Sequence, residues 1–369
     1  MKKIIFLQSK FPVENQALFQ LLYRWKTYRE KLKTEDAQAD IWIFTLKHFP
    51  IESEKLLNEF SLNLIENAKQ KTWFFSRLKA LREVVVTNKD GITLVCGDNQ
   101  LDLLIAVGLK LFSVHSIRIQ IQFHGDIYSF RTNSGFYGLL RVCLSRVAIH
   151  IADSIRVVSK FQFQDINQIS SDNRNKLVLA PIPIDFSRVS RISKFIQYDV
   201  AFIGRLHVER GISDLIEILT LLFIHKPEIK VVIVGDGPLR HKIEKKLSDW
   251  IIDSKISILG FLSVEQIREI YASTKILIST APHEGYGLTV REAVLSNVCV
   301  IARESKGVLE AQQSFPSSIQ TYRNSKHAVD LIKLQLEKPR IALKDEFIID
   351  QLNSDEKSLN RLVSSWLLN

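Results

Sequence analysis

Two glutamates separated by seven residues lie beside a pair of glycines in the second half of the chain. Glu284 shares a loop with Gly285 and Gly287, and Glu292 follows one turn into a helix expected to begin at Leu288. Glycine lets a ligand approach the backbone closely, and the N–H groups at a helix start are ready donors to a phosphate. A carboxylate accepts hydrogen bonds from paired sugar hydroxyls, so this set suits a sugar nucleotide. An ordinary turn and a solvated helix residue explain the same pattern about equally well.

Two arginines flank a short loop earlier in the same half. Gly204 ends an expected strand, Arg205 follows it directly, and Arg210 and Gly211 precede the next helix. Arginine donates two parallel hydrogen bonds to an oxyanion and keeps its charge, so the pair could neutralise a diphosphate. A single arginine here would more often be a solvated surface residue, but two around one loop favour an anion site.

A histidine occupies the end of an expected strand in the first half. His124, Gly125 and Asp126 follow Gln122-Phe123, at the edge of a parallel sheet where ligand clefts form. A lone histidine is more often structural, so its position is the argument for a function. The sequence contains no Asp-x-Asp pair, the usual carboxylate set for a metal-bound diphosphate, and we expect no metal site.

Short apolar runs alternate with longer amphipathic stretches along the chain, which is typical of parallel sheets covered by helices. In the first half, strands are expected at Lys3–Leu7, Ile41–Thr45, Gly91–Cys96, Ile117–Phe123 and Lys176–Leu179, and helices at Gln16–Lys31, Glu54–Lys69, Asn99–Leu111 and Gly135–His150. In the second half, strands are expected at Tyr198–Ile203, Ile229–Val234, Ile256–Leu259, Ile276–Ser279 and Val298–Ala302, and helices at Ile212–Ile224, Leu239–Trp250, Val264–Ala272, Leu288–Asn297 and Ser354–Leu368.

This alternation predicts an α/β fold with two doubly wound, Rossmann-like domains facing a cleft, and a ligand at the carboxyl ends of the strands. Pro181, Pro183 and a polar stretch after them interrupt the regular elements. We therefore expect an N-terminal domain at 1–185, a linker at 186–198, a C-terminal domain at 199–353 and a helix at 354–369 that packs back toward the N-terminal domain.

Composition and charge limit the class of protein. The 369 residues are 46% hydrophobic and 24% charged, which excludes a disordered or collagen-like chain. No apolar run approaches the roughly 18 residues of a membrane span. Three widely spaced cysteines without a Cys-x-x-Cys pair suit a reduced cytosolic protein without zinc. Residues 1–190 carry a net charge of +8 and the remainder +2, so the first half suits an anionic partner, although solubility alone explains the charge as well.

Together these segments resemble glycosyltransferases of the GT-B fold, specifically glycosyltransferase family 4, the group 1 family. The resemblance is strong over residues 199–310 and thinner over 120–185. It rests on the Glu284-to-Glu292 spacing with Gly285-Tyr286-Gly287-Leu288, on Gly204-Arg205-Leu206 with Arg210-Gly211, on Gly235–Pro238, on Gly307–Glu310, on Pro181–Asp185 and on His124.

The resemblance implies transfer of a sugar from a nucleotide-diphosphate donor to an acceptor hydroxyl, with retained configuration, no metal and no cofactor. Arg205 and Arg210 would stabilise the departing diphosphate with the N–H groups of Tyr286, Gly287, Leu288 and Thr289. Glu284 would hold donor sugar hydroxyls and Glu292 the ribose. His124 would lie beside the donor sugar from the acceptor-side N-terminal domain. The loop with Phe261, and the backbone at Gly204 and Gly285, would complete the nucleotide-sugar site.

The chain departs from the family at three places. Arg210 replaces the usual lysine, residues 8–13 replace a glycine-rich loop, and no glycine-bearing strand is apparent after Glu310. The second departure affects the expected acceptor geometry. Two alternatives remain open: a catalytically silent GT-B protein that binds sugar nucleotides or acts as a scaffold, and a nucleic-acid binder. The retained Arg205, Arg210, Glu284 and Glu292 argue against the first, and the absence of any recognised nucleic-acid motif argues against the second.

Residues 69–82 interleave basic side chains with three consecutive aromatic residues. On a helix, Phe74, Leu78 and Leu81 would share a face that can lie in a headgroup layer, with cations toward anionic lipid. An ordinary core-facing helix explains this segment at least as well on its own, but the basic first half favours a membrane. We expect a cytoplasmic protein, peripheral on the inner face of the membrane, that extends a lipid-linked acceptor or a surface glycan.

Overall fold

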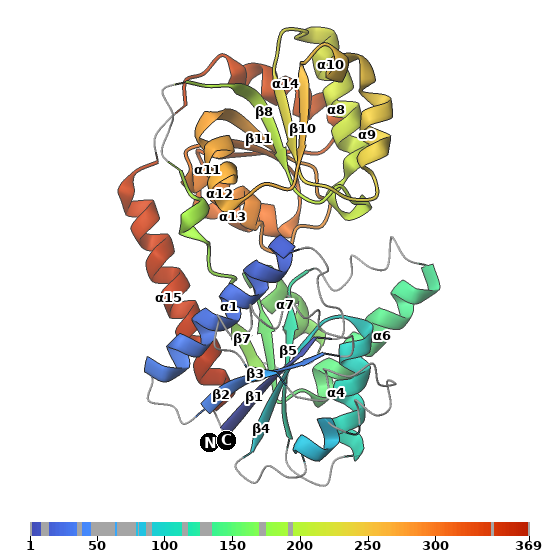
Figure 1. The fold of residues 1–369 in the computed structure, drawn as a ribbon, viewed down its shortest axis with the longest axis vertical. Helices are drawn as coiled ribbons and strands as arrows, with labels where there is room; N and C mark the ends of the chain where they lie inside the picture. Colours follow the sequence, from blue (N-terminus) through green and yellow to red (C-terminus); the bar gives the residue numbers. More distant parts are fainter. Residues whose placement is uncertain are drawn as a thin grey trace. The chain divides into compact units, whose positions relative to one another are not determined.

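The computed structural model describes residues 2–8, 15–34, 39–45, 63–64, 79, 81–85, 91–112, 117–125, 135–169, 175–190, 195–340 and 343–367 (Figure 1). The chain forms two compact units. Unit 1 comprises Met1–Pro181 and Glu356–Asn369, and unit 2 comprises Ile182–Asp355.

The described strands of unit 1 form one parallel seven-stranded sheet in the order β3-β2-β1-β4-β5-β6-β7. Their bounds are β1 Lys2–Gln8, β2 Ala39–Thr45, β3 Asn63–Leu64, β4 Ile92–Gly97, β5 Ile117–Phe123, β6 Ser154–Val157 and β7 Leu177–Leu179. In β1, Ile5 and Leu7 enter the apolar core on one face, while Ile4 and Phe6 enter the core on the other. The strand is apolar on both of its faces and is therefore buried on both.

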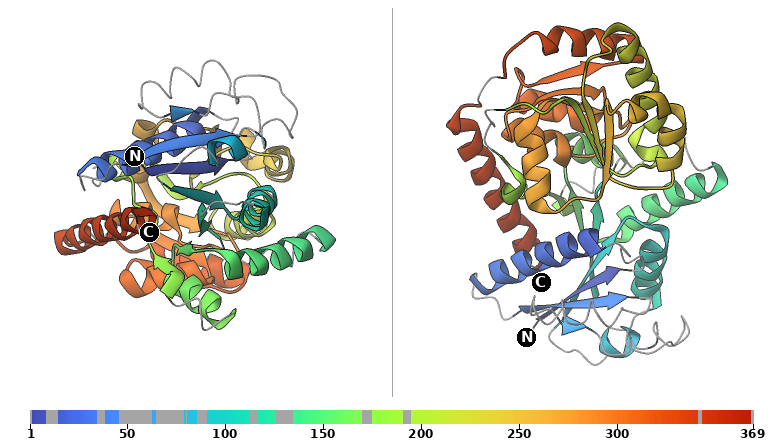
Figure 2. Two further views of the ribbon diagram at one scale, coloured as in Figure 1. Left: turned by 90° about the horizontal axis from the view of Figure 1, so that it is seen from below. Right: turned by 45° about the horizontal axis from the view of Figure 1, so that its top comes forward.

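Different helices cover the two faces of this sheet (Figures 1 and 2). On one face lie α4 (Gln100–Phe112), α6 (Gly135–Ile151) and the helical residues 81–85. On the other lie α1 (Asn15–Thr34) and the end of α15 (Asp345–Leu367), while α7 (Lys160–Ile169) connects β6 to β7. Leu22, Trp25, Tyr28 and Leu32 give α1 its buried stripe at helical spacing.

Unit 2 has a parallel six-stranded sheet in the order β10-β9-β8-β11-β12-β13. The strands are β8 Tyr198–Ile203, β9 Val231–Val234, β10 Ile256–Gly260, β11 Thr274–Ser279, β12 Cys299–Arg303 and β13 Ile319–Tyr322. One face is covered by α8 (Ile212–His225), α9 (Arg240–Lys246) and α14 (Ser325–Leu336), the other by α11 (Val264–Ser273), α12 (Leu288–Leu295) and α13 (Lys306–Ser314). Both sheets thus have the strand order of a doubly wound fold, as predicted.

Several predicted elements need correction. The helix expected at Leu239–Trp250 is two helices, α9 and α10 (Ser248–Ile252), with Leu247 between them. The helix expected at Glu54–Lys69 is wrong at residues 63–64, which form β3; its other residues lie outside the described part of the chain. The expected C-terminal helix begins earlier, at Asp345. Five helices and strands were not predicted: β6, α7, α13, β13 and α14.

None of the helices in the described ranges is long and apolar enough to cross a membrane. Most of the segment 69–82 lies outside the described residues, which include only Lys79, Leu81 and Arg82 of it. Leu81 is fully buried in the core of unit 1, while Lys79 and Arg82 are exposed.

Candidate functional site

Glycines bring the loops after β8 and β9 into direct contact. A Cβ atom on Gly235 would lie 2.0 Å from the carbonyl oxygen of Gly204, and one on Gly237 would lie 2.6 Å from that of Leu206. Both glycines have positive φ angles, 130° and 154°. The N–H of Leu206 donates to the carbonyl oxygen of Asp236 at 2.9 Å. The loop that carries both arginines is therefore held at the carboxyl end of β8 by close backbone packing.

Arg210 is positioned by a second close approach of two loops. It ends a short 3-10 helix, Val208–Arg210, and the next residue, Gly211, adopts a left-handed conformation with φ 66°. A Cβ atom on Gly211 would lie 2.0 Å from the carbonyl oxygen of Thr280, whose Oγ1 donates to the carbonyl oxygen of Arg210 at 2.6 Å. The loops after β8 and β11 thus meet at Arg210.

The structure brings two of the predicted site residues together. Nη1 of Arg210 donates to Oε2 of Glu284 at 2.7 Å, although 74 residues separate them in the sequence. Both side chains are partly buried. A cation and a carboxylate are therefore paired beside the glycine loops at the carboxyl ends of β8 and β11, where doubly wound domains bind ligands.

The loop after β11 ends at the start of α12. Gly287, with φ 75°, precedes the first helical residue, Leu288, and no side chain caps this end of the helix. The N–H of Gly307 donates to the carbonyl oxygen of Glu284 at 3.0 Å and fixes the loop from the other side. Gly285 and Tyr286 are buried, whereas Leu288 and Thr289 are partly accessible at the helix start.

Glu292 has a different environment from Glu284. Its side chain is 2% exposed, and both carboxylate oxygens accept hydrogen bonds: Oε1 from Arg188 at 2.8 Å and Oε2 from the Tyr271 hydroxyl at 3.1 Å. Burial raises the pKa of Glu292 to about 7, although Arg188 and Tyr271 both favour the ionised form. The two glutamates of the motif thus form two separate ion pairs with two different arginines.

The remaining predicted donor-site residues of unit 2 lie at the surface. Arg205 is 61% exposed and its Nη2 contacts Oε2 of Glu209 at 3.2 Å. Phe261 is 46% exposed directly after β10, where Gly260 turns the chain with φ 66°. Both side chains have room to reorganise around a ligand, whereas the side chain of Glu292 is enclosed.

His124 belongs to unit 1, directly after β5. Burial, Arg156 and Arg24 together lower the pKa of His124 to about 3, so the imidazole is neutral at ordinary pH. Its assignment to the reaction comes from the resemblance and stays a prediction.

Sequence reasoning missed Arg188 and Tyr271. Arg188 lies in the predicted linker, in the 3-10 helix Phe186–Arg188, and Tyr271 lies in α11. An arginine shortly after the Pro181–Asp185 segment was visible in the sequence as part of a polar stretch. Nothing in the sequence linked it to a carboxylate 104 residues further on.

Comparison with known proteins finds a family model similar to most of unit 2. Residues 189–348 match the family model described as glycosyl transferases group 1. The match covers most of unit 2 and less than half of the chain. The predicted site residues Glu284, Glu292, Arg205 and Arg210 all lie inside the matched stretch.

Two curated relatives are similar to parts of the chain. An uncharacterized glycosyltransferase of Bacillus subtilis, YqgM, is 23% identical over 169 residues, which are 45% of this chain and 46% of YqgM. Alpha-monoglucosyldiacylglycerol synthase of Acholeplasma laidlawii is 28% identical over 112 residues, 29% of this chain and 27% of that enzyme. The chain thus spans less than half the length of either relative.

A solved structure shows that the likeness in fold extends beyond residues 189–348. Anabaena HepE, in complex with UDP-glucose, superimposes with a TM-score of 0.68 over 99% of both chains, at 15% sequence identity. The fold is therefore the predicted GT-B fold.

Proposed function

We propose that this protein is a retaining glycosyltransferase that moves a sugar from a nucleotide-diphosphate sugar to an acceptor hydroxyl. The observation that carries the proposal is the 2.7 Å pair of Arg210 and Glu284 beside the uncapped start of α12. A cation, a carboxylate and a row of backbone N–H groups at one edge of the sheet match the diphosphate and the sugar of such a donor. UDP-glucose bound to Anabaena HepE supports this choice of ligand.

Catalysis in this proposal rests on stabilising the leaving diphosphate. When a donor binds, Arg210 turns part of its hydrogen bonding from Glu284 to the diphosphate, and the exposed Arg205 closes over it. Glu284 then accepts from hydroxyls of the donor sugar. The leaving phosphate oxygen takes the proton of the acceptor hydroxyl on the same face, so no side-chain base is needed. The two arginines and the helix start supply the counter-charge that a metal supplies elsewhere.

Glu292 holds the ribose hydroxyls in this proposal. Each carboxylate oxygen can accept a second hydrogen bond, so Arg188 and Tyr271 leave acceptor capacity for a ligand. Arg188 and Tyr271 then orient the carboxylate, and Phe261 lies beside the nucleobase.

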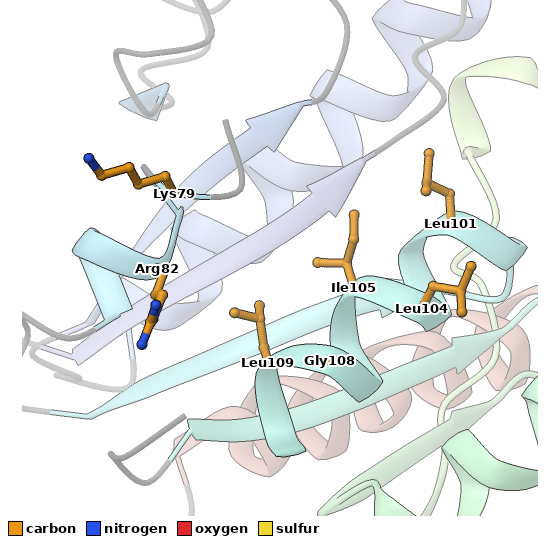
Figure 3. Close-up of a pocket in the computed structure, with 7 residues that line it drawn as sticks. All are labelled: Lys79, Arg82, Leu101, Leu104, Ile105, Gly108 and Leu109. Atoms are coloured by element: carbon orange, nitrogen blue, oxygen red, sulfur yellow. The ribbon is translucent and has the colours of Figure 1, made fainter. Parts of the chain in front are cut away.

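For the acceptor, we propose a lipid-linked or surface glycan used at a membrane. The alpha-monoglucosyldiacylglycerol synthase among the relatives supports a lipid-borne acceptor. Unit 1 contains a cavity of about 470 Å³ (Figure 3). Apolar side chains of α4 line one side of it, and the cations Lys79 and Arg82 line the other. Leu104 and Leu111 of α4 are 50% and 66% exposed. Apolar side chains next to cations suit a layer of anionic lipid.

The membrane proposal is tested by flotation with liposomes. Binding should require anionic lipid, weaken as salt screens the charges, and weaken further in Lys79→Glu. Lys26→Glu, which places the same charge change on α1, serves as the control. Equal recovery of the protein in the soluble fraction with and without anionic vesicles would refute membrane binding and leave the glycosyltransferase proposal intact.

The enzyme proposal is tested with a panel of nucleotide sugars, first by thermal stabilisation and then by mass spectrometry of products. Glu284→Gln should lower transfer roughly 10–100-fold, the cost of one charged hydrogen bond, while Glu292→Gln should mainly weaken donor binding. Glu217→Gln, at an exposed position of α8, is the matched control. Donor binding without turnover would favour the silent GT-B alternative.

Activity should also survive EDTA, and a strict requirement for Mg²⁺ or Mn²⁺ would contradict the mechanism.

A further inference from the structure

Unit 1 contains a buried arginine without a carboxylate partner in the described ranges. Arg156 of β6 is 1% exposed. Its hydrogen bonds to described residues all go to neutral acceptors: the carbonyl oxygens of Ala180 and Pro181 at 2.9 and 3.3 Å, the Tyr28 hydroxyl at 3.2 Å and Oε1 of Gln122 at 3.1 Å. Burying a guanidinium without a counter-charge is costly, so its positive charge remains available to an anion nearby.

A second cation lies next to this arginine. Arg24 precedes Tyr28 by four residues on α1, which places both side chains on one face of the helix. Burial lowers the pKa of Arg24; Tyr28 opposes this shift and Arg156 adds to it. Within the described residues, Arg24 also lacks an ion pair. Two like charges therefore share one partly buried region.

An unpartnered imidazole completes the group. His124 directly follows β5, two residues after Gln122, and Gln122 pairs in register with Arg156. Nδ1 of His124 is buried and has no hydrogen-bond partner among the residues described. The next residue, Gly125, has open space around it: a Cβ atom built there meets no described atom within 4 Å.

We propose that Arg24, His124 and Arg156 form a binding site for a phosphoryl group carried by the acceptor. Arg24 and the Nδ1–H of the neutral His124 donate hydrogen bonds to the phosphoryl oxygens. The positive charge of Arg156 attracts the phosphoryl group without a direct hydrogen bond. A phosphate with close to two negative charges matches two guanidiniums better than a single carboxylate does.

The site lies at the carboxyl ends of β5 and β6, the ligand-binding edge of the sheet of unit 1. The identification of the phosphate as part of the acceptor rests on the proposed function, because unit 1 is the acceptor side in that proposal. The anion site itself rests only on the charges and contacts of unit 1.

The test is calorimetric titration of the full chain with inorganic phosphate. The double variant Arg205→Gln/Arg210→Gln removes the cations proposed for the donor diphosphate and serves as the background. In this background we expect phosphate to bind, with a dissociation constant raised at least about 10-fold by Arg24→Gln. Lys26→Gln, which removes a different cation from α1, should leave binding unchanged. Binding that is lost in the double variant, or that is unaffected by Arg24→Gln, overturns the site.

Thermal unfolding without ligand gives an independent readout. If Arg24 is an uncompensated cation, Arg24→Gln raises the midpoint of unfolding by relieving its repulsion with Arg156, and added phosphate stabilises the wild type more than the variant. If Arg24 is only a structural residue, the variant lowers the midpoint and phosphate stabilises both proteins equally, which overturns the proposal.

Two further probes identify the source of the phosphoryl group. Glycerol 3-phosphate represents a soluble acceptor, and phosphatidylcholine vesicles with phosphatidic acid represent a lipid headgroup. Arg24-dependent binding of either supports the site, and Arg24-independent binding of both contradicts it. Failure of the glycosyltransferase proposal is seen separately, as absence of donor binding or sugar transfer in a protein that still binds phosphate at Arg24.

Discussion

Glu284 and Glu292 carry the same functional group but differ in what surrounds it. Glu284 pairs with Arg210, and both side chains are partly accessible to solvent. Glu292 is buried and pairs with Arg188 and Tyr271. Replacing Glu292 with alanine would leave the mostly buried Arg188 unpaired, which typically costs 3–5 kcal/mol. A test of its binding role therefore needs glutamine, which keeps the shape and the hydrogen bond from Tyr271.

The raised pKa of Glu292 makes stability depend on pH in a defined direction. In the unfolded chain a glutamate titrates near 4.3, whereas burial raises the folded pKa of Glu292 to about 7. Folding thus favours the protonated form: its stabilisation is fully present below the unfolded pKa and is lost as pH rises through 7. The loss is on the order of 3 kcal/mol. Urea unfolding of wild type and Glu292→Gln from pH 4.5 to 8 measures it, and parallel curves would contradict the shift.

His124 gives an opposite, separately measurable prediction. Its folded pKa of about 3 lies below the ordinary value near 6.5, so it contributes stability above pH 6.5 that is lost as pH falls toward 3. Its imidazole NMR signals, assigned by their loss in His124→Gln, should not move between pH 8 and 5. A signal that titrates near 6.5 would show that the ring is not held in a buried cationic environment.

The sequence could predict the identity of the site residues but not their pairing. Two arginines, two glutamates and the glycines between them stand out by type and spacing. That Arg210 pairs with Glu284 and Arg188 with Glu292 depends on loops that meet only in the folded domain. Tyr271 had no signal, because a tyrosine on the buried stripe of a helix resembles an ordinary core residue.

At the scale of elements, the glycines of the β8 and β9 loops are the most sensitive positions. Gly235→Ala would force a Cβ atom to within 2.0 Å of a carbonyl oxygen at a positive φ angle, so we expect destabilisation of more than about 2 kcal/mol. Gly108→Ala is the control, because a Cβ atom there meets no described atom within 4 Å, and it should stabilise α4 by about 0.5–1 kcal/mol. Denaturant unfolding compares the two; equal effects would contradict the loop geometry.

The elements that the sequence predicted are those with strong apolar periodicity. The strands β5 and β8 have their predicted bounds, because each carries buried apolar residues and has a neighbouring strand on both sides. By contrast, β13 (Ile319–Tyr322) has only four residues, two of them polar, at the edge of its sheet. In α7, mostly polar residues obscure the helical period. Pattern reasoning fails where an element is short, polar or at an edge, since tertiary contacts then stabilise it.

At the scale of the molecule, the end of the chain completes the core of unit 1. Trp366 is fully buried, stacks edge-on against Phe6 and Tyr28, and donates from Nε1 to Oε1 of Gln120 at 2.6 Å. We expect Trp366→Ala to destabilise unit 1 by about 3–5 kcal/mol, as large core truncations do. Hydrogen exchange of the β1 and α1 amides would report the loss. Ser364→Ala, at an exposed position two residues earlier, should change nothing, and similar protection in both variants would exclude this role.

The helix α15 contributes its residues up to Asp355 to unit 2 and those from Glu356 onward to unit 1. On a ribosome, the strands of unit 1 emerge early, but the tryptophan that fills their core is translated only after all of unit 2. At about 5–20 residues per second, this delay lasts on the order of 10–40 seconds. The unit that is synthesised first is therefore finished last. During that interval, the apolar surface around Phe6 and Tyr28 is a natural substrate for chaperones, and a stop codon anywhere in unit 2 would leave both units incomplete.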